Sequence, residues 1–283
     1  MQTRPGRLRD LIQKGPMMVG PGAIDGLTAK LIEQAGFPMV YMTGAGTSLS
    51  RGFPDLGLLT MSEMVENAGV IARSVAIPVL ADADTGYGNE LNVTRTVREY
   101  ERRGVAGIHL EDQVSPKRCG HMEGKEIVGR EEYLSKIRAA VRARTTPDFL
   151  IIARTDARTV AGFDEAVARA NGALEIGADV AFVEAPQSVD EIAAIPNLIR
   201  GPCLHCIAPG GNGPVIGLED AEEMGYRLAL VPGLLVTAII ESCDAALQRL
   251  ASHRYPGHEG AGMTIADLHR RFGSDEWDAL RMP

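Results

Sequence analysis

The chain has 283 residues, of which 45% are hydrophobic and 23% charged, a balance typical of a globular enzyme with room for one large core. Its formal net charge is −8 and its basic residues form no block, which argues against a nucleic-acid-binding groove. The start of the chain lacks the apolar stretch of a secretory signal, and no apolar run is long enough to cross a bilayer. We therefore expect a cytoplasmic protein with reduced cysteines and neither a membrane nor a nucleic-acid partner.

Short apolar segments alternate with amphipathic helical patterns along the chain. The apolar runs are nearly continuous, which is typical of parallel strands that are buried on both faces. Several of the helical patterns end in a glycine, the usual residue at a helix C-terminus. Strands are predicted at 16–20, 39–44, 78–84, 107–112, 149–155, 180–185, 203–208 and 228–233, and the clearest helices at 26–36, 90–104, 133–144 and 163–177.

The number of these units favours one fold. Eight alternating strands and helices in one domain of this length predict a closed (β/α)8 TIM-type barrel, with a doubly wound open sheet as the alternative. We predict that the barrel spans 1–251. A C-terminal extension, 252–283, carries one more helical pattern at 264–272, which a barrel does not need. We expect this extension to pack on a neighbouring subunit.

Acidic residues follow the third and fourth predicted strands. In a (β/α)8 barrel the active site lies at the carboxyl ends of the strands, and carboxylates buried there need a partner or a cation. Asp82, Asp84 and Glu111 supply the oxygen ligands that Mg²⁺ or Mn²⁺ prefers. If the strand continued, Asp82 and Asp84 would point the same way. The alternative is that Asp84 caps the next helix and Asp82 pairs with Arg154.

Two glycine-containing loops lie at the same predicted rim. Residues 43–47 offer successive backbone N–H groups that suit a carboxylate or phosphate. The loop 115–125 places Cys119 beside Lys117 and Arg118, cations that are expected to lower the pKa of the thiol. Its glycines would let it close over a ligand. We favour a catalytic Cys119 over an incidental surface cysteine.

Cys203 and Cys206 form a C-x-x-C pattern inside a predicted strand. Residues three apart in a strand point to opposite faces, so we predict one core thiol and one thiol at the rim. A redox or zinc pair is the alternative, but the chain has no second C-x-x-C that would complete a zinc site.

Seven short motifs together carry a family resemblance. They are MTGAGTS, FPDLG, DADTGYG, HLEDQ, KRCGH, ARTDA and VEAP, within residues 4–250. In these motifs the chain resembles the isocitrate lyase/phosphoenolpyruvate mutase superfamily, and within it the 2-methylisocitrate lyase and 2,3-dimethylmalate lyase branch. The resemblance implies a Mg²⁺-dependent lyase, with Mn²⁺ as a substitute. It would cleave a 2-hydroxy di- or tricarboxylate to pyruvate or glyoxylate and a carboxylate such as succinate or propionate. It also implies a homotetramer with exchanged C-terminal helices.

The resemblance further implies a role for each matching residue. Asp82, Asp84 and Glu111 would hold the metal directly or through water, with Asp55 supporting them. Cys119 would be the proton donor, and Arg154 would hold the substrate near its developing oxyanion. The polar network and the candidate bases would comprise Tyr41, His109 and Glu184, and the other substrate contacts Thr43, Gly44, Ala45, Gly46, Gly120, His121 and Cys206.

The seventh strand departs from the branch. Cys206 stands where such lyases usually carry Asn, and Gly213 stands where Ser or Thr precedes Pro214. His205 or Asn212 would have to compensate for this loss of groups that hold the distal carboxylate. Two alternatives therefore stay open: oxaloacetate decarboxylation or phosphonopyruvate mutase or hydrolase chemistry at the same site, and a non-catalytic carboxylate-binding paralogue.

Overall fold

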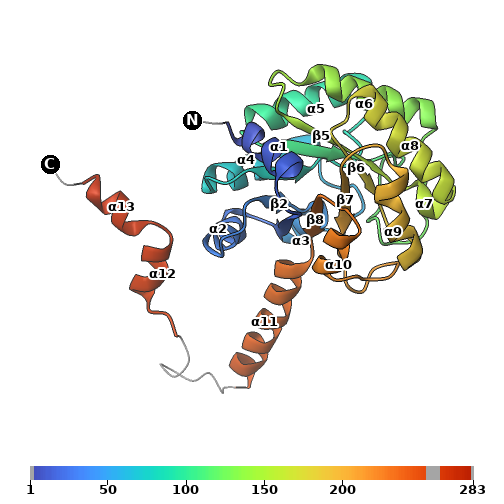
Figure 1. The fold of residues 1–283 in the computed structure, drawn as a ribbon. Helices are drawn as coiled ribbons and strands as arrows, with labels where there is room; N and C mark the ends of the chain where they lie inside the picture. The colour runs from blue at the N-terminus through green and yellow to red at the C-terminus, as the bar shows by residue number, and fades with distance from the viewer. Residues whose placement is uncertain (1–2, 253–261, 282–283) are drawn as a thin grey trace. The chain divides into compact units, whose positions relative to one another are not determined.

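A computed structural model of the protein describes residues 3–252 and 262–281 (Figure 1). The chain divides into two compact units, Met1–Val236 and Thr237–Pro283. The second unit therefore begins inside helix α11, ahead of the expected extension 252–283. None of the helices in the described residues is long and apolar enough to cross a membrane.

The first unit is a closed barrel of parallel strands in chain order, in which β8 pairs with β1. This confirms the predicted TIM-type barrel and removes the open-sheet alternative. Each strand lies within or overlaps the range predicted for it. The strands are β1 (Met18–Ala23), β2 (Val40–Met42), β3 (Val79–Asp82), β4 (Gly107–Leu110), β5 (Leu150–Thr155), β6 (Val180–Val183), β7 (Cys203–Cys206) and β8 (Leu228–Val231).

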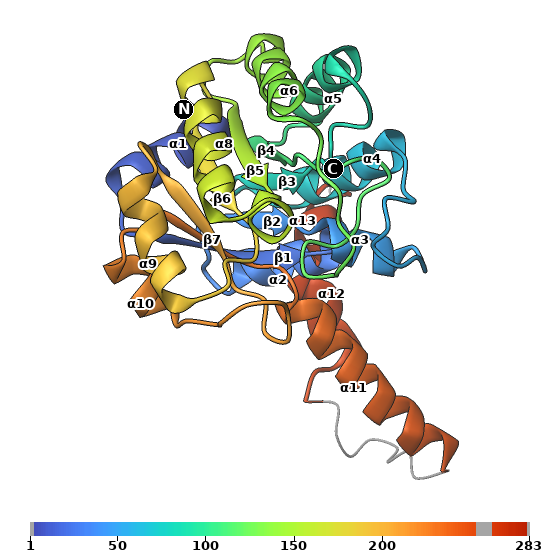
Figure 2. The same ribbon diagram turned by 90° about the vertical axis from the view of Figure 1, so that its right-hand side faces the viewer.

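Helices surround these strands, as Figure 2 shows for α5, α6 and α8. The predicted glycine ends are found: α8 ends at Gly177, whose φ of 110° is left-handed and favours glycine. The helices of the first unit and the junction are α1 (Arg4–Lys14), α2 (Gly26–Gln34), α3 (Gly44–Ser50), α4 (Met61–Ser74), α5 (Glu90–Arg102), α6 (Arg130–Ala143), α7 (Ala157–Val160), α8 (Phe163–Ile176), α9 (Val189–Leu198), α10 (Leu218–Glu223) and α11 (Leu234–Ala251).

The strands are buried on both faces, as their continuous apolar runs predict. Side chains such as Leu80 and Phe182 pack inside the barrel, where Leu8 of α1 joins them. Neighbours such as Val79 and Ile151 instead pack outward against the helices. This alternation fixes which residues at the strand ends face the barrel axis.

The second unit contains the C-terminal helices α12 (Ile265–Arg271) and α13 (Ser274–Ala279), which confirm the helical pattern predicted there. Neither helix buries a residue. Large apolar side chains of the second unit are exposed: Ile265, Trp277 and Leu280 are 78%, 72% and 77% exposed.

Candidate active site

The carboxyl ends of the strands bring the predicted polar residues to one end of the barrel, because all eight strands run in parallel. Each of these residues ends a strand, follows one directly or lies near its end. They are Tyr41 on β2, Asp82 on β3, His109 on β4 with Glu111 after it, Arg154 on β5, Glu184 after β6 and Cys206 on β7.

Asp82, Asp84 and Glu111 are buried, with 4%, 5% and 1% exposure. The strand β3 ends at Asp82 and Asp84 has a φ of 45°, so the expected common direction from a continuing strand is wrong. Instead the Asp84 N–H donates to Asp82 Oδ1 at 2.9 Å. The alternative, that Asp84 caps the next helix and Asp82 pairs with Arg154, is wrong as well. Asn89 caps α5, and the ion pairs of Arg154 are with other carboxylates.

Lys117 contacts two of the carboxylates. Its Nζ donates to Asp55 Oδ1 at 2.6 Å and lies 3.0 Å from Asp84 Oδ1. Although burial lowers the pKa of Lys117, the nearby carboxylates, Asp84 first, raise it well above its usual value. The sequence had indicated Lys117 only as a cation near Cys119, and its two contacts link Asp55 to Asp84.

Buried oxygens in this set lie against cations or lack a partner. Asp84 Oδ1 lies 3.0 Å from Lys117 Nζ and Glu111 Oε2 lies 3.3 Å from Arg154 Nη1, while Glu111 Oε1 accepts no hydrogen bond. Burial raises the pKa of both carboxyl groups. An oxygen-only donor set fits Mg²⁺ or Mn²⁺. Among the described residues, however, the oxygens of Asp82, Asp84 and Glu111 do not gather within 4.8 Å of one another. An ion bound here would therefore be held partly through water, and Mg²⁺ usually keeps several water ligands.

Arg154 is buried among carboxylates. Its Nε donates to Asp156 Oδ2 at 2.9 Å and its Nη2 to Asp156 Oδ1 at 3.2 Å. Its Nη1 lies 3.3 Å from Glu111 Oε2 and its Nη2 3.9 Å from Glu184 Oε1. This fixes the guanidinium, the group that we predict to hold the substrate. Asp156, which lies in the ARTDA motif, was not among the predicted site residues.

The loop 115–125 is anchored on both sides. The side chain of Gln113 accepts from Arg118 N at 3.0 Å and donates to Arg118 O at 2.8 Å. The Cys119 N–H donates to Asp55 O at 3.1 Å. These bonds hold the Cys119 thiol at the rim that carries the carboxylates.

The pKa of Cys119 differs from the expectation. Burial, together with the charge of Asp55, raises it above its usual value, and Arg154 and Lys117 offset this only in part. The expectation of a lowered pKa is wrong, because burial outweighs the nearby cations and Lys117 is paired with carboxylates. Cys119 is therefore protonated at neutral pH, the state that a proton donor needs.

Gly120 brings the loop close to Arg154 and Glu184. A Cβ at this position would lie 2.3 Å from both Arg154 Nη2 and Glu184 Oε1, so a larger residue would displace one of them. The next residue, His121, places Nε2 at 3.2 Å from Glu184 Oε1. The structure thus brings the predicted contacts Gly120 and His121 against the predicted network residue Glu184.

Lys125 joins this loop to the arginine. Its Nζ donates to Gly120 O at 2.5 Å and to Asp156 Oδ1 at 2.7 Å, and it is buried. Burial raises the pKa of Asp156, but the cations Arg154 and Lys125 outweigh it and lower the pKa to about 2. Lys125 was not among the predicted site residues, although it ends the loop 115–125.

We expect Lys125→Met to lower kcat/KM by about 10–100-fold, because the loop and Arg154 both lose a fixed partner. Steady-state kinetics measures this, and faster trypsin cleavage after the exposed Arg118 reports loop opening. Lys14→Met is the matched control, since the Lys14 side chain is 73% exposed. Unchanged kinetics and cleavage in Lys125→Met would contradict the role given to this contact.

Tyr41 and His109 form a buried pair. The Tyr41 hydroxyl lies 2.8 Å from His109 Nε2, and the rings stack at a centroid distance of 5.7 Å. Burial lowers the pKa of His109 to about 3, so its imidazole is neutral at pH 7. Burial also raises the pKa of Tyr41 well above its usual value. The pair can therefore relay a proton between neutral groups, in keeping with the predicted network.

The segment 43–47 begins helix α3 rather than a loop. Thr43 caps the helix, with its Oγ1 accepting from Gly46 N at 3.3 Å, so that N–H is not available to a ligand. The N–H groups of Gly44 and Ala45 lie in the first turn, where a helix offers them no partner of its own. Gly44 also allows Asp82 to approach, since a Cβ there would lie 2.3 Å from Asp82 Oδ2.

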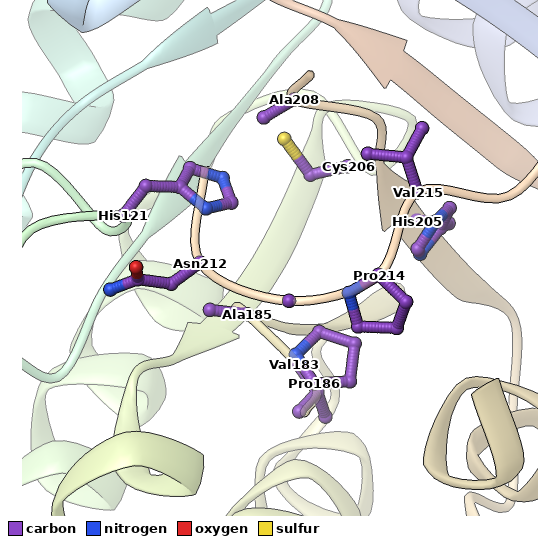
Figure 3. A pocket seen from close by; sticks show the side chains of 11 residues that line it. His121, Val183, Ala185, Pro186, His205, Cys206, Ala208, Asn212, Pro214 and Val215 are labelled. Carbon is purple, nitrogen blue, oxygen red and sulfur yellow. The ribbon is translucent and has the colours of Figure 1, made fainter. Parts of the chain in front are cut away.

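A pocket lies beside β6 and β7 (Figure 3). Cys206 is half-buried and lines it, whereas Cys203 is 1% exposed and packs with the helix layer, as predicted for this pair. The pocket contains no Lys or Arg, and burial lowers the pKa of His205 to about 4, so His205 is uncharged at pH 7. It is lined by His121, Val183, Ala185, Pro186, His205, Cys206, Ala208, Asn212, Gly213, Pro214 and Val215.

Buried carboxylates, a fixed arginine and a thiol-bearing loop at the carboxyl ends of the strands define a (β/α)8-barrel enzyme that acts on small anionic substrates. The sequence profile of the phosphoenolpyruvate phosphomutase family matches residues 8–251. The chain therefore belongs to this family, in the isocitrate lyase/phosphoenolpyruvate mutase superfamily.

Relatives place it more closely. The chain is 51% identical over 227 residues to 2,3-dimethylmalate lyase of Eubacterium barkeri, covering 80% of this chain and 78% of the relative. It is 43% identical over 248 residues to 2-methylisocitrate lyase of Aeropyrum pernix, covering 87% and 80%. A solved structure of oxaloacetate acetylhydrolase with the inhibitor 3,3-difluorooxalacetate has a TM-score of 0.94 and 38% identity, covering 98% of this chain and 96% of that one. The predicted superfamily, fold and enzyme class are confirmed.

Proposed function

We propose that the protein is a divalent-metal-dependent lyase that cleaves a 2-alkylmalate of the 2,3-dimethylmalate kind into pyruvate and propionate. The observation that carries the proposal is the position of the loop. Gly120 lies against Arg154 and Glu184, which brings the Cys119 thiol to the rim occupied by the carboxylates. A proton donor and a fixed cation at one rim suit a reaction that leaves electrons on a carbon beside a carboxylate.

The pocket beside β6 and β7 supports an alkyl group in the substrate's distal half. 2-Methylisocitrate carries a carboxymethyl group where 2,3-dimethylmalate carries a methyl group. A carboxylate in a pocket without Lys or Arg would have no cation to offset its loss of water. Val183, Pro214 and Val215 instead offer apolar contact to an alkyl group.

The proposed reaction conserves the proton that it moves. The 2-hydroxyl loses its proton, the bond between carbons 2 and 3 breaks, and the new carbonyl belongs to pyruvate. The electron pair left on carbon 3 takes the proton of the Cys119 thiol, which gives propionate. The proton from the hydroxyl then restores the thiol through the rim groups. Two routes can receive it: the Tyr41–His109 pair and Glu184, whose Oε2 accepts no hydrogen bond.

A divalent cation would be held by Asp82, Asp84 and Glu111, and when bound it would favour loss of the hydroxyl proton. Arg154 is oriented by Asp156 and keeps its charge, so it can stabilise the carboxylate on which negative charge develops. Gly44 and Ala45 offer N–H groups for the carboxylate of pyruvate.

A substrate panel tests the proposal. With Mg²⁺ present and pyruvate or glyoxylate detected by a coupled assay, we expect kcat/KM for 2,3-dimethylmalate to exceed that for 2-methylisocitrate by at least about tenfold. Chelation of the metal should abolish turnover. Isocitrate, citramalate, oxaloacetate and phosphonopyruvate complete the panel.

The other outcomes identify what is wrong. Faster turnover of 2-methylisocitrate would contradict the alkyl pocket but leave the lyase in place. Turnover of oxaloacetate or phosphonopyruvate alone would contradict the lyase and favour oxaloacetate decarboxylation or phosphonopyruvate chemistry at the same site. Consumption of oxaloacetate without formation of pyruvate would instead indicate hydrolysis to oxalate, the product bound in a solved structure of oxaloacetate acetylhydrolase. No consumption of any substrate would favour the non-catalytic alternative.

We also propose a homotetramer in the cytoplasm. The exposed apolar residues Ile265, Trp277 and Leu280 of the C-terminal unit support association, because large exposed apolar groups usually mark an interface. Four free cysteines support a reducing compartment. Sedimentation velocity of the full chain measures the subunit number, and a monomer would contradict the proposed tetramer.

A further inference from the structure

A second set of possible metal ligands lies across the rim from the carboxylates. One donor atom each from His121, Glu184 and Cys206 lies within 4.8 Å of the others, the one such group of three that the described residues contain. His121 comes from the loop 115–125, whereas Glu184 and Cys206 come from the ends of β6 and β7. In Figure 3 the sulfur of Cys206 points toward the side of the pocket that carries the His121 ring.

The polar atoms of this group lack partners. The Glu184 side chain is 3% exposed, and its Oε2 accepts no hydrogen bond. Both ring nitrogens of His121 are also buried without a hydrogen bond, although Nε2 lies 3.2 Å from Glu184 Oε1. Buried polar groups are nearly always satisfied in folded proteins, so this cluster is incomplete as it stands.

The donor types differ from those of the carboxylate set. An imidazole, a carboxylate and a thiolate suit Zn²⁺, whereas Mg²⁺ takes oxygen ligands. Ligands around a tetrahedral zinc lie about 3.5 Å from one another, so donors already within 4.8 Å need only small side-chain movements. Three protein ligands would leave a fourth position to water or substrate, as in zinc sites that are open.

We propose that His121, Glu184 and Cys206 form a site for a thiophilic divalent cation, Zn²⁺, which ties the loop 115–125 to the barrel rim and inhibits the enzyme. One ligand lies on the loop, whereas Cys206 ends β7 and Glu184 directly follows β6, so the ion would hold the loop in the position that the structure shows. Glu184 would then be unable to serve the polar network around Arg154. The site is separate from the oxygen set that Mg²⁺ suits, and binding does not depend on which substrate is cleaved.

Cobalt gives a direct test of the thiol ligand. With Mg²⁺ saturating and a non-thiol reductant present, Co²⁺ should give a thiolate-to-cobalt charge-transfer band at one ion per chain. The band should be lost in Cys206→Ser and kept in Cys119→Ser, Cys243→Ser and Asp84→Asn. A band that is absent from the wild type, that persists in Cys206→Ser, or that depends on Cys119 would overturn the proposal.

A variant on the loop guards against misfolding of Cys206→Ser. We expect His121→Asn to weaken Zn²⁺ binding at least about tenfold by calorimetry in Mg²⁺. Zn²⁺ should slow trypsin cleavage after Arg118 in the wild type and not in His121→Asn. Equal Zn²⁺ affinity in the two proteins, or cleavage of the wild type that Zn²⁺ leaves unchanged, would overturn the proposal.

Discussion

Replacing Cys119 by serine is expected to lower kcat for carbon–carbon cleavage by about 10²–10⁴-fold, the usual contribution of a positioned proton donor. The raised pKa of Cys119 keeps its proton in place at neutral pH, and serine is a far weaker acid in the same position. Binding should survive, because the carboxylates and Arg154 are untouched. Calorimetry with oxalate and Mg²⁺ should therefore give a similar Kd for the two proteins.

The matched control is Cys243→Ser. Cys243 is exposed on α11, so its loss should leave kcat unchanged. Full activity in Cys119→Ser would remove the thiol from the mechanism. Loss of both turnover and oxalate binding would instead mean that the loop had lost its position on Asp55.

The barrel was predictable from the sequence because each strand is a short, nearly continuous apolar run that can be recognised locally. The run 149–155 is apolar until Arg154, and it forms β5 with Arg154 near its end. A parallel strand buried on both faces must be apolar throughout, so a charged residue marks where the strand meets the rim. Asp82 and Glu111 were predictable for the same reason. The direction of Asp84 was not, because no pattern of apolar residues reveals its left-handed backbone.

The contacts within the site were much less predictable. Lys117 meets Asp55 across 62 positions of the chain, and such a pair depends on how two loops fold over the barrel. Lys125 and Asp156 were missed for the same reason. The direction of the pKa shift of Cys119 was predicted wrongly. Neighbouring residues in the sequence reveal nearby charges but not burial, and burial is the largest cause of the shift.

The carboxylates around Arg154 explain why its geometry matters as much as its charge. Asp156 accepts from Nε and Nη2, while Nη1 faces Glu111. Two further residues hold Asp156 in place. Lys125 Nζ donates to Asp156 Oδ1 at 2.7 Å, and the Asp156 N–H donates to Asp112 Oδ1 at 2.8 Å. A planar guanidinium can pair with both oxygens of Asp156 while Nη1 faces Glu111, and an ammonium cannot reproduce this forked geometry.

We therefore expect Arg154→Lys to lower kcat/KM by about 10²–10³-fold, comparable to losing one donor that stabilises a developing anion. Leaving a buried carboxylate without its cation destabilises the folded state by roughly 3–5 kcal/mol, and lysine avoids most of this cost because it keeps the positive charge. The drop should appear mainly in kcat, since the charge that attracts the substrate remains. Steady-state kinetics and thermal unfolding measure the two effects separately.

Arg158→Lys is the control that isolates the geometry at Arg154. Arg158 also makes a forked pair, with both distances to Glu191 at 2.7 Å, but its side chain is 23% exposed and lies outside the site. Water can replace that pair, so its loss should leave kcat unchanged and alter unfolding by less than about 1 kcal/mol. Equal kinetics in Arg154→Lys and Arg158→Lys would show that charge alone is required at β5, and the arrangement of Asp156 and Lys125 would then serve the fold rather than the reaction.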